Sequence, residues 1–356
     1  MHIRPGCSTA VPIGVSVRIA GIVGAAFVLG AAGTAVGAAQ GLSQTAAPDW
    51  QAVAARVVPG LVDVNTQLGL EGAVGAGTGI VVTPADDVIT NNHVVEGATD
   101  ISVTDIGNGR TYGAVVTGFD RASDIAVLHL TNASGLTTAP LGASGAARVG
   151  DDVAGVGNAG GVGGAPTVAP GRITGLNQTI TANDDVTGGA EQLRGLIQVA
   201  ADIEPGDSGG PLVSANGQVI GVDTAATARY RLGSRGGEGF AIPIDDVLPV
   251  ARQIEAGAAS TAVHIGATAM LGVSVSDANG SGALVHAVVA GAPAEQAGLV
   301  TGAVITKLDA APVTSATALT AAMDQHHPGD RVSVDWTDPQ GQPHSSTIQL
   351  VAGPVG

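Results

Sequence analysis

A serine stands between an acidic residue and two glycines in EPGDSGGPL, the stretch that runs from Glu204 to Leu212. Pro, Gly, Asp and Ser all favour turns, so one interpretation of this stretch is a simple loop. The other interpretation makes Ser208 a nucleophile, with glycines that let a substrate carbonyl approach backbone N–H groups. A serine hydroxyl becomes reactive only when a base accepts its proton and a further group orients that base. The chain must therefore supply a histidine and a carboxylate on ordered elements.

His93, in VITNNHVVEGATD, directly follows a short apolar run that is typical of a strand. Asp124, in FDRASDIAVLHL, precedes a second such run and is expected to be partly buried there. Asp120 is the nearest rival acid, but its position favours a turn. The order His93, Asp124, Ser208 is the order of the catalytic triad in chymotrypsin, and it differs from the orders in subtilisin and the α/β-hydrolases.

Three motifs in this order resemble the HtrA/Deg branch of the trypsin-like serine proteases: TNNHVV, SDIAVL and PGDSGGPLV. The later stretch GFAIPIDDV is also similar to that family, and the Ala- and Gly-rich composition resembles its secreted mycobacterial members. The resemblance covers residues 49–258. It implies that His93 is the general base and acid, that Asp124 orients its imidazole, and that Ser208 attacks the scissile carbonyl. It further implies an oxyanion hole formed by the backbone N–H groups of Gly206 and Ser208.

The resemblance leaves the specificity pocket open. Asp202 occupies the place where trypsin carries its cation-binding acid, whereas HtrA relatives usually have a small apolar residue there. An Asp202 buried in the pocket would favour Arg or Lys side chains. An Asp202 turned to solvent would leave Ile203 and Ala225 to favour small aliphatic side chains, and we favour this alternative. Thr224, next to Ala225, completes the predicted substrate-binding set.

Short apolar runs separated by turn residues dominate residues 49–258, with few interleaved helices. An Asn216-Gly217 pair between two of these runs predicts a hairpin. We therefore expect a mainly β protein whose protease domain is a chymotrypsin-like double β-barrel. Two helices are expected to flank this domain, over residues 50–61 and 247–257.

Residues 261–352 form a second predicted unit, of small α+β type, with helices over 293–299 and 315–326. Ser315 is its expected N-cap. The stretch GAPAEQAGLVTGAVITKLDAAPV (291–313) resembles the PDZ signature of HtrA proteases. This implies a loop at Met270, Leu271, Gly272 and Val273 that binds a peptide's terminal carboxylate while the peptide adds as a strand. The alternative is a generic α+β domain.

The first 39 residues carry a long apolar run without charge, preceded by Arg4 and Arg18. Small residues at 36–38 suit cleavage of a signal peptide, although the run is also long enough for a retained membrane anchor. A linker is expected over 40–48. Either outcome places the domains outside the cytoplasm, in a secreted or cell-envelope location. The lone cysteine, Cys7, excludes an intrachain disulfide.

A net charge of −16 argues against a nucleic-acid partner, because binding to phosphates requires clustered cations. The histidines show no metal-ligand spacing, so neither a metal nor another cofactor is expected. The sequence thus predicts an exported serine endopeptidase for unfolded or damaged proteins, and the resemblance implies a homotrimer. Two alternatives remain: a peptide-binding adaptor or chaperone with a dormant protease site, and an esterase that uses the same triad.

Overall fold

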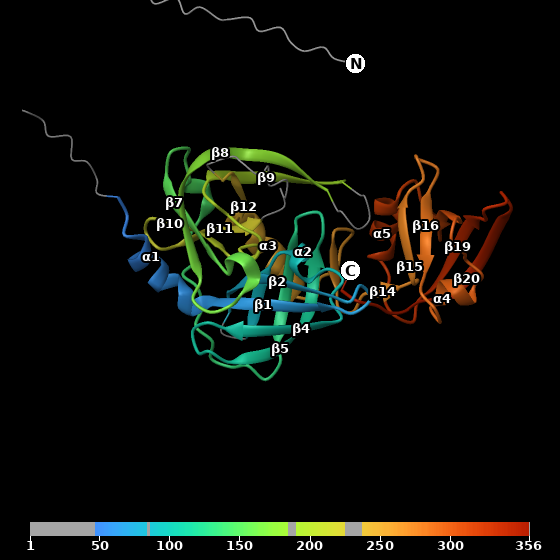
Figure 1. Cartoon of the computed structure of the whole chain (residues 1–356), viewed down its shortest axis with the longest axis horizontal. Helices are drawn as coiled ribbons and strands as arrows, with labels where there is room; N and C mark the ends of the chain where they lie inside the picture. Colours follow the sequence, from blue (N-terminus) through green and yellow to red (C-terminus); the bar gives the residue numbers. More distant parts are fainter. Residues whose placement is uncertain (1–46, 84–85, 184–189, 225–236, 356) are drawn as a thin grey trace, which may run out of the picture. The chain divides into compact units, whose positions relative to one another are not determined.

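The structure of the protein is a computed structural model that describes residues 47–83, 86–183, 190–224 and 237–355 (Figure 1). The predicted leader over 1–39, most of the predicted linker and Ala225 lie outside the described residues. None of the helices in the described ranges combines the length and the apolarity that crossing a bilayer requires.

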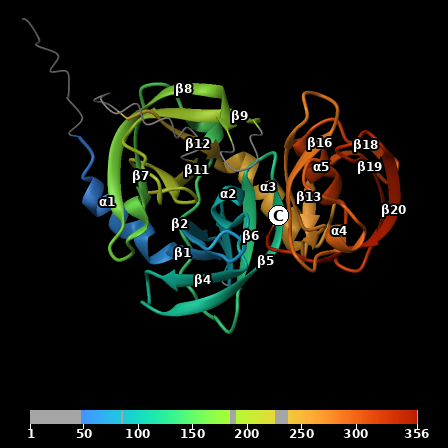
Figure 2. The ribbon, with the colours of Figure 1, turned by 45° about the vertical axis from the view of Figure 1, so that its right-hand side comes forward.

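The first half of the protease domain is a closed ring of six antiparallel strands (Figures 1 and 2). Its order is β5-β4-β1-β2-β3-β6, and the ring closes because β5 also pairs with β6. The strands are β1 (Leu61–Leu68), β2 (Ala73–Val81), β3 (Asp87–Thr90), β4 (Asp100–Asp105), β5 (Thr111–Asp120) and β6 (Ile125–Leu130). Most of the side chains that fill it are valines, leucines and isoleucines, since the chain has few aromatic residues.

The second half is a closed barrel of the order β10-β11-β12-β9-β8-β7. Its strands are β7 (Asp152–Gly157), β8 (Thr167–Asn183), β9 (Ala190–Ala200), β10 (Pro211–Ser214), β11 (Val219–Thr224) and β12 (Gly239–Pro243). The predicted double β-barrel is therefore confirmed. Strand β2 belongs to the first barrel and the β9–β10 connection belongs to the second. Residues of these two segments can therefore be in contact where the barrels pack against each other.

The hairpin predicted at Asn216-Gly217 joins β10 to β11. Only Gly217 has a positive φ, 75°, so the turn is not the type I′ turn that Asn-Gly pairs often form. The N–H of Ser214 donates to the carbonyl of Gln218, and the N–H of Gly217 donates to the carbonyl of Ser214. The hairpin is thus confirmed, with a longer loop.

Two helices flank the barrels. Helix α1 (Trp50–Val57) begins where the Asp49 carboxylate accepts a hydrogen bond from the N–H of Ala52, at 3.2 Å. Helix α3 (Ile244–Glu255) begins three residues earlier than expected, with Asp245 and Asp246 in its first turn, where acidic side chains suit the positive end of the helix dipole.

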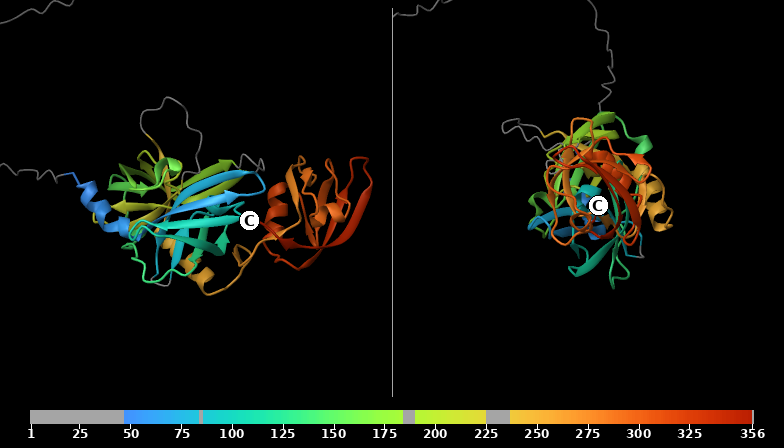
Figure 3. Two further views of the ribbon diagram at one scale, coloured as in Figure 1. Left: turned by 60° about the horizontal axis from the view of Figure 1, so that its bottom comes forward. Right: turned by 90° about the vertical axis from the view of Figure 1, so that its right-hand side faces the viewer.

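The C-terminal unit is a small α+β domain, as predicted (Figure 3, orange to red). Its main sheet has the order β15-β16-β17-β19-β20. The strands are β13 (Val263–Ile265), β14 (Ala269–Met270), β15 (Val273–Asp277), β16 (Ala283–Val288), β17 (Val304–Leu308), β18 (Ala311–Pro312), β19 (Arg331–Thr337), β20 (Pro343–Gln349) and β21 (Val351–Ala352). Strand β13 pairs with β5 of the first barrel instead of joining this sheet.

Two helices cover this sheet, α4 (Pro293–Gln296) and α5 (Ala316–Met323). The predicted N-cap of α5 is confirmed, because the Ser315 hydroxyl accepts a hydrogen bond from the N–H of Ala318 at 3.0 Å. Both helices are shorter than the sequence pattern indicates, and Gly298, with φ of 90°, follows the end of α4.

Candidate active site

The structure brings the predicted base and its orienting acid together. His93 lies in the short helix α2 (Asn92–Val95), which follows β3, and Asp124 lies in the connection between β5 and β6. The ring Nδ1 of His93 is 2.9 Å from Oδ2 and 3.1 Å from Oδ1 of Asp124. The backbone N–H of His93 also donates to Oδ1, at 3.0 Å. One carboxylate therefore holds both the main chain and the ring of the histidine.

Asp124 is itself held from two sides. The hydroxyl of Thr224, on β11 of the second barrel, donates to Oδ2 at 3.1 Å, and the side-chain amide of Asn91 donates to the Asp124 carbonyl at 3.0 Å. The residue is 5% exposed and adopts a left-handed conformation with φ of 54°. Asp and Asn tolerate this region better than other residues with a side chain do. Contacts from both barrels thus determine where the carboxylate points.

Ser208 lies in the loop between β9 and β10, and Thr78 of β2 holds this loop from the other barrel. The N–H of Thr78 donates to the Ser208 carbonyl at 2.8 Å. Its hydroxyl donates to the Gly206 carbonyl at 2.7 Å and accepts from the N–H of Asn158 at 2.9 Å. The position of the predicted nucleophile therefore depends on one buried threonine across the interface between the barrels.

Gly206, the predicted oxyanion donor, has no room for a side chain. Its φ is 102°, and a Cβ at this position would lie 2.1 Å from the carbonyl oxygen of Asn158. A non-glycine residue would meet both an unfavourable backbone conformation and a steric clash. The backbone of the nucleophile loop therefore requires glycine here.

We expect Gly206→Ala to lower the free energy of unfolding by about 2 kcal/mol or more, because conformational strain and overlap with Asn158 add. Gly135→Ala is the matched control, since Gly135 has φ of 67° but a Cβ added there would have nothing within 4 Å. The control should lose about 1 kcal/mol. Urea unfolding of the two variants measures both free energies of unfolding. An equal loss of stability in the two variants would contradict a steric role for the Asn158 carbonyl beside Gly206.

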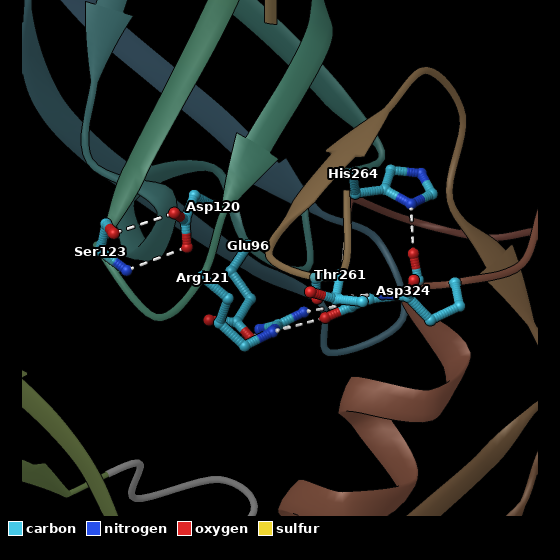
Figure 4. Close-up of polar contacts among 8 residues, drawn as sticks. Glu96, Asp120, Arg121, Ser123, Thr261, His264 and Asp324 are labelled. Atoms are coloured by element: carbon cyan, nitrogen blue, oxygen red, sulfur yellow. Dashed lines mark hydrogen bonds and ion pairs between the residues drawn. The ribbon is translucent and has the colours of Figure 1, made fainter. Parts of the chain in front are cut away.

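The connection that leads to Asp124 is anchored by charged side chains (Figure 4). Arg121 forms ion pairs with Glu96, which follows α2, and with Asp324, which follows α5; its Nε lies 3.2 Å from Asp324 Oδ2. Asp120 is the last residue of β5 and so lies just before the predicted turn; its carboxylate accepts hydrogen bonds from the N–H and the hydroxyl of Ser123. The Asp324 carbonyl contacts Nδ1 of His264 at 2.7 Å.

Two buried carboxyl groups lie close to the nucleophile loop. Burial raises the pKa of Asp207, and hydrogen bonds from the N–H of Glu204 and the hydroxyl of Thr167 partly oppose this. Burial also raises the pKa of Asp223 well above its usual range, and the charge of Asp207 raises it further. The folded chain therefore holds these two protons more tightly than the unfolded chain. The resulting stability is complete below the unfolded-state pKa and is lost as the pH rises through the folded-state values.

The predicted substrate-binding residues lie in different surroundings. Asp202 is exposed, and its Oδ1 accepts a hydrogen bond from the N–H of Gly237 at 2.8 Å. Ile203 is half-buried, whereas Thr224 is buried with its hydroxyl on Asp124. The described part of the chain contains no group of three or more His, Cys, Asp or Glu side chains that could hold a metal ion.

The predicted carboxylate-binding loop connects β14 to β15. Gly272 has φ of 85°, and a Cβ there would lie 2.2 Å from that of Ala292. The carbonyls of Leu271 and Gly272 accept hydrogen bonds from the N–H groups of Ala294 and Val289, both at 2.9 Å. Strand β15, which starts at Val273, is the first strand of the sheet, and Met270 is half-buried before it. An added peptide strand would find its partner at this edge.

Two residues that contact the site were not singled out by sequence reasoning. Thr78 lies in the run GAGTGIVV, where a lone threonine among glycines and apolar residues is the only signal. Asn91 precedes His93 by two residues and resembles a loop residue. Their roles depend on atoms that are 33 or more positions away in the sequence, which local pattern cannot indicate.

Comparisons with known proteins agree with this geometry. Residues 77–222 match the trypsin-like peptidase domain family, and residues 269–337 match the PDZ domain family. Serine protease PepD of Mycobacterium tuberculosis is 37% identical over 317 residues, which are 85% of this chain and 65% of PepD. Periplasmic serine endoprotease DegP of Escherichia coli K12 is 35% identical over 270 residues, 72% of this chain and 53% of DegP.

A solved structure of a variant of the HtrA-type protease AlgW with tripeptide is 28% identical, with a TM-score of 0.50, and covers 86% of this chain and 98% of that chain. The chain spans between half and two thirds of the length of the curated relatives it matches. The matched domain families, their order along the chain and the named relatives all agree with the interpretation of the motifs around His93, Asp124 and Ser208. The chain belongs to the HtrA/Deg family of trypsin-like serine proteases and carries one PDZ domain.

Proposed function

We propose that the chain is an exported serine endopeptidase that cleaves unfolded or damaged proteins through an acyl-enzyme. The observation that carries the proposal is the two-point contact of the Asp124 carboxylate with the backbone N–H and the ring Nδ1 of His93. This contact leaves Nε2 as the ring atom for proton transfer. A histidine held in this way is the base that a serine nucleophile needs.

In the first half of the reaction, the Ser208 Oγ forms a bond to the scissile carbonyl carbon and its proton passes to Nε2 of His93. The backbone N–H groups of Gly206 and Ser208 stabilise the negative charge that develops on the carbonyl oxygen. The peptide C–N bond then breaks, and His93 gives its proton to the leaving amine. Asp124 stabilises the imidazolium in between.

In the second half, water attacks the acyl-enzyme, and His93 accepts a proton from the water and returns one to Ser208. The free serine hydroxyl and a new carboxyl terminus result, so atoms and charges balance. Ile203 and Thr224 are the described residues that we propose to contact the substrate side chain. No step requires a cofactor.

The PDZ domain would bind C-terminal or extended peptides at the loop 270–273, adding them to the edge of β15. The tripeptide named with the AlgW variant supports a peptide ligand in this family. Export is supported by the apolar leader and by the periplasmic relative DegP. A homotrimer and membrane attachment through the leader are further parts of the proposal.

A fluorophosphonate probe, which reacts with activated serines, tests the proposal on the whole chain. We expect wild-type protein to be labelled and to degrade unfolded casein faster than folded proteins or a small ester, while Ser208→Ala does neither. Absence of labelling in wild type, together with peptide binding by the PDZ domain, would instead support the adaptor alternative. Rapid ester cleavage without casein degradation would support the esterase.

A further inference from the structure

The direction of the Gly206 N–H, the predicted oxyanion donor, depends on the carbonyl of the preceding residue. Pro205 and Gly206 share one peptide group, and the described residues contain no cis peptide bond. In a trans peptide group the carbonyl and the N–H point in opposite directions. The Pro205 carbonyl accepts a hydrogen bond from the N–H of Gly160 at 2.7 Å. The Gly206 N–H therefore points away from Gly160, and rotation of this peptide group would break that bond.

Gly160 lies in a short turn, Ala159–Gly161, that Asn158 holds in shape. The Asn158 carbonyl accepts from the N–H of Gly161 at 2.8 Å, and its side-chain oxygen accepts from the N–H of Gly163 at 2.7 Å. Gly160 has φ of 75°, a conformation that glycine adopts without steric cost. The position of the Gly160 N–H thus depends on where Asn158 is anchored.

One hydroxyl group, that of Thr78 on β2, is bonded to both sides of this arrangement. It accepts from the N–H of Asn158 at 2.9 Å, which anchors the turn, and it donates to the Gly206 carbonyl at 2.7 Å. Thr78 is 0% exposed, so solvent does not compete for these two bonds. The peptide groups on the two sides of Gly206 are therefore both held, directly or through the turn, by a single oxygen atom.

The backbone of Thr78 connects the same residue to the element that carries the histidine. Its carbonyl accepts from the hydroxyl of Thr90 at 2.8 Å. Thr90 is the last residue of β3, three positions before His93, and it is 0% exposed. A Cβ on Gly209 would lie 2.1 Å from the Thr78 carbonyl oxygen and 2.3 Å from the Thr90 hydroxyl, so the nucleophile loop packs closely against both threonines.

We propose that Thr78 is a positioning residue for the oxyanion hole, and that its hydroxyl keeps the Gly206 N–H directed at the carbonyl oxygen of the substrate. This inference rests on the proposed function and adds to it a residue that touches neither the substrate nor the reacting atoms. Without the hydroxyl, the Gly206 carbonyl and the Asn158 N–H lose a partner inside the protein, which is costly for buried groups. Rotation of the neighbouring peptide groups relieves this cost and turns the Gly206 N–H away.

The test compares Thr78→Val, which keeps the shape of the side chain without its hydroxyl, with Thr78→Ser, which keeps the hydroxyl. Thr66→Val is the matched control, because Thr66 is a threonine of the same barrel, 1% exposed, whose hydroxyl has no hydrogen-bond partner within the described ranges. We expect Thr78→Val to lower kcat for a quenched peptide about 100-fold with little change in KM, as for loss of one oxyanion donor. Thr78→Ser should recover most of this loss, and Thr66→Val should stay within about threefold of wild type.

Replacing the substrate's carbonyl oxygen by sulfur separates an effect on the oxyanion hole from a general loss of structure. The sulfur of a peptide thionoester is larger and accepts hydrogen bonds more weakly than oxygen, so its cleavage gains less from the oxyanion donors. The ratio of kcat/KM for the peptide ester over its thionoester should therefore fall about tenfold in Thr78→Val. A purely structural defect would lower both rates together, and Thr78→Ser and Thr66→Val should keep the wild-type ratio.

A second variant leaves the Thr78 side chain in place, and so it decides the matter if Thr78→Val does not fold. Asn158→Ala removes only the side-chain bond to the N–H of Gly163, and it should lower the ester-to-thionoester ratio in the same direction. An unchanged ratio in a folded Thr78→Val or in Asn158→Ala, or a Thr78→Ser variant as impaired as Thr78→Val, would overturn the inference. Wild type that a fluorophosphonate fails to label would contradict the proposed function itself, whereas labelled wild type with an unchanged ratio in the variants contradicts only the role of Thr78.

Discussion

Ser208→Ala should lower kcat for peptide cleavage by about 10⁵- to 10⁶-fold, the largest effect expected of any single substitution in this chain. The variant lacks the oxygen that would form the acyl-enzyme, and nothing else in the loop replaces it. Its fold should be unchanged, because the contact that ties this residue to the first barrel uses its backbone carbonyl, which accepts from the N–H of Thr78.

The measurement is single-turnover and steady-state cleavage of one quenched peptide by wild type and variant. Ser214→Ala is the matched control, since Ser214 lies six residues further along, in β10, and its described hydrogen bonds to Gln218 and Gly217 use only backbone atoms. It should keep kcat within about threefold of wild type, as expected of a substitution away from the site. A Ser208→Ala variant with a tenth or more of the wild-type activity would contradict a serine mechanism.

Asp124→Asn is expected to have the second largest effect, a fall in kcat of about 10⁴-fold, the size that the loss of the triad carboxylate has in other serine proteases. An amide in place of the carboxylate can donate to Nδ1 of His93, which leaves the proton on the wrong ring nitrogen. It also fails to stabilise the imidazolium. Asparagine tolerates the φ of 54° at this position, so the backbone should stay in place.

Asp120→Asn distinguishes this role from a general effect of losing an acid in the same connection. Asp120 is as buried as Asp124, but its carboxylate holds the N–H and hydroxyl of Ser123 and not the histidine. We expect its kcat to fall by less than about tenfold, with any larger loss appearing in stability. A greater loss of activity in Asp120→Asn than in Asp124→Asn would contradict the proposal that Asp124 orients the histidine. Circular dichroism of both variants checks that they are folded.

Local sequence determined much of the architecture. Short apolar runs bounded by turn residues predicted the strands, because both signals are local to each strand. Asn216-Gly217 and Ser315 predicted a hairpin and a helix N-cap, since both depend on atoms only a few residues apart. The helix ends were less well predicted: α3 begins three residues before the expected position, and α4 ends before Gly298, which has a positive φ.

The residues of the candidate site could likewise be predicted only in part from local sequence. His93, Asp124 and Ser208 could be proposed from three short motifs, because each motif carries its own turn and strand signals. The contact between His93 and Asp124, by contrast, joins residues 31 positions apart and exists only once β3 and β6 pair. Thr78 and Thr224 reach the site from strands whose own sequence patterns show only that they are buried.

Which acid lies inside the second barrel was decided by tertiary structure alone. Asp202 follows an apolar strand, whereas Asp223 lies within one. The distance from Ser208 placed Asp202 where trypsin carries its pocket acid, and of the two alternatives we favoured an Asp202 turned to solvent. Barrel closure places β11 between β10 and β12, which buries Asp223 completely beside Ile203, while the loop after β9 leaves Asp202 exposed to water. The sequence alone determined the strands, the motifs and their order. Long-range strand pairing decided which acidic side chains are buried away from water, because desolvation depends on every neighbour in space and not on neighbours in the chain.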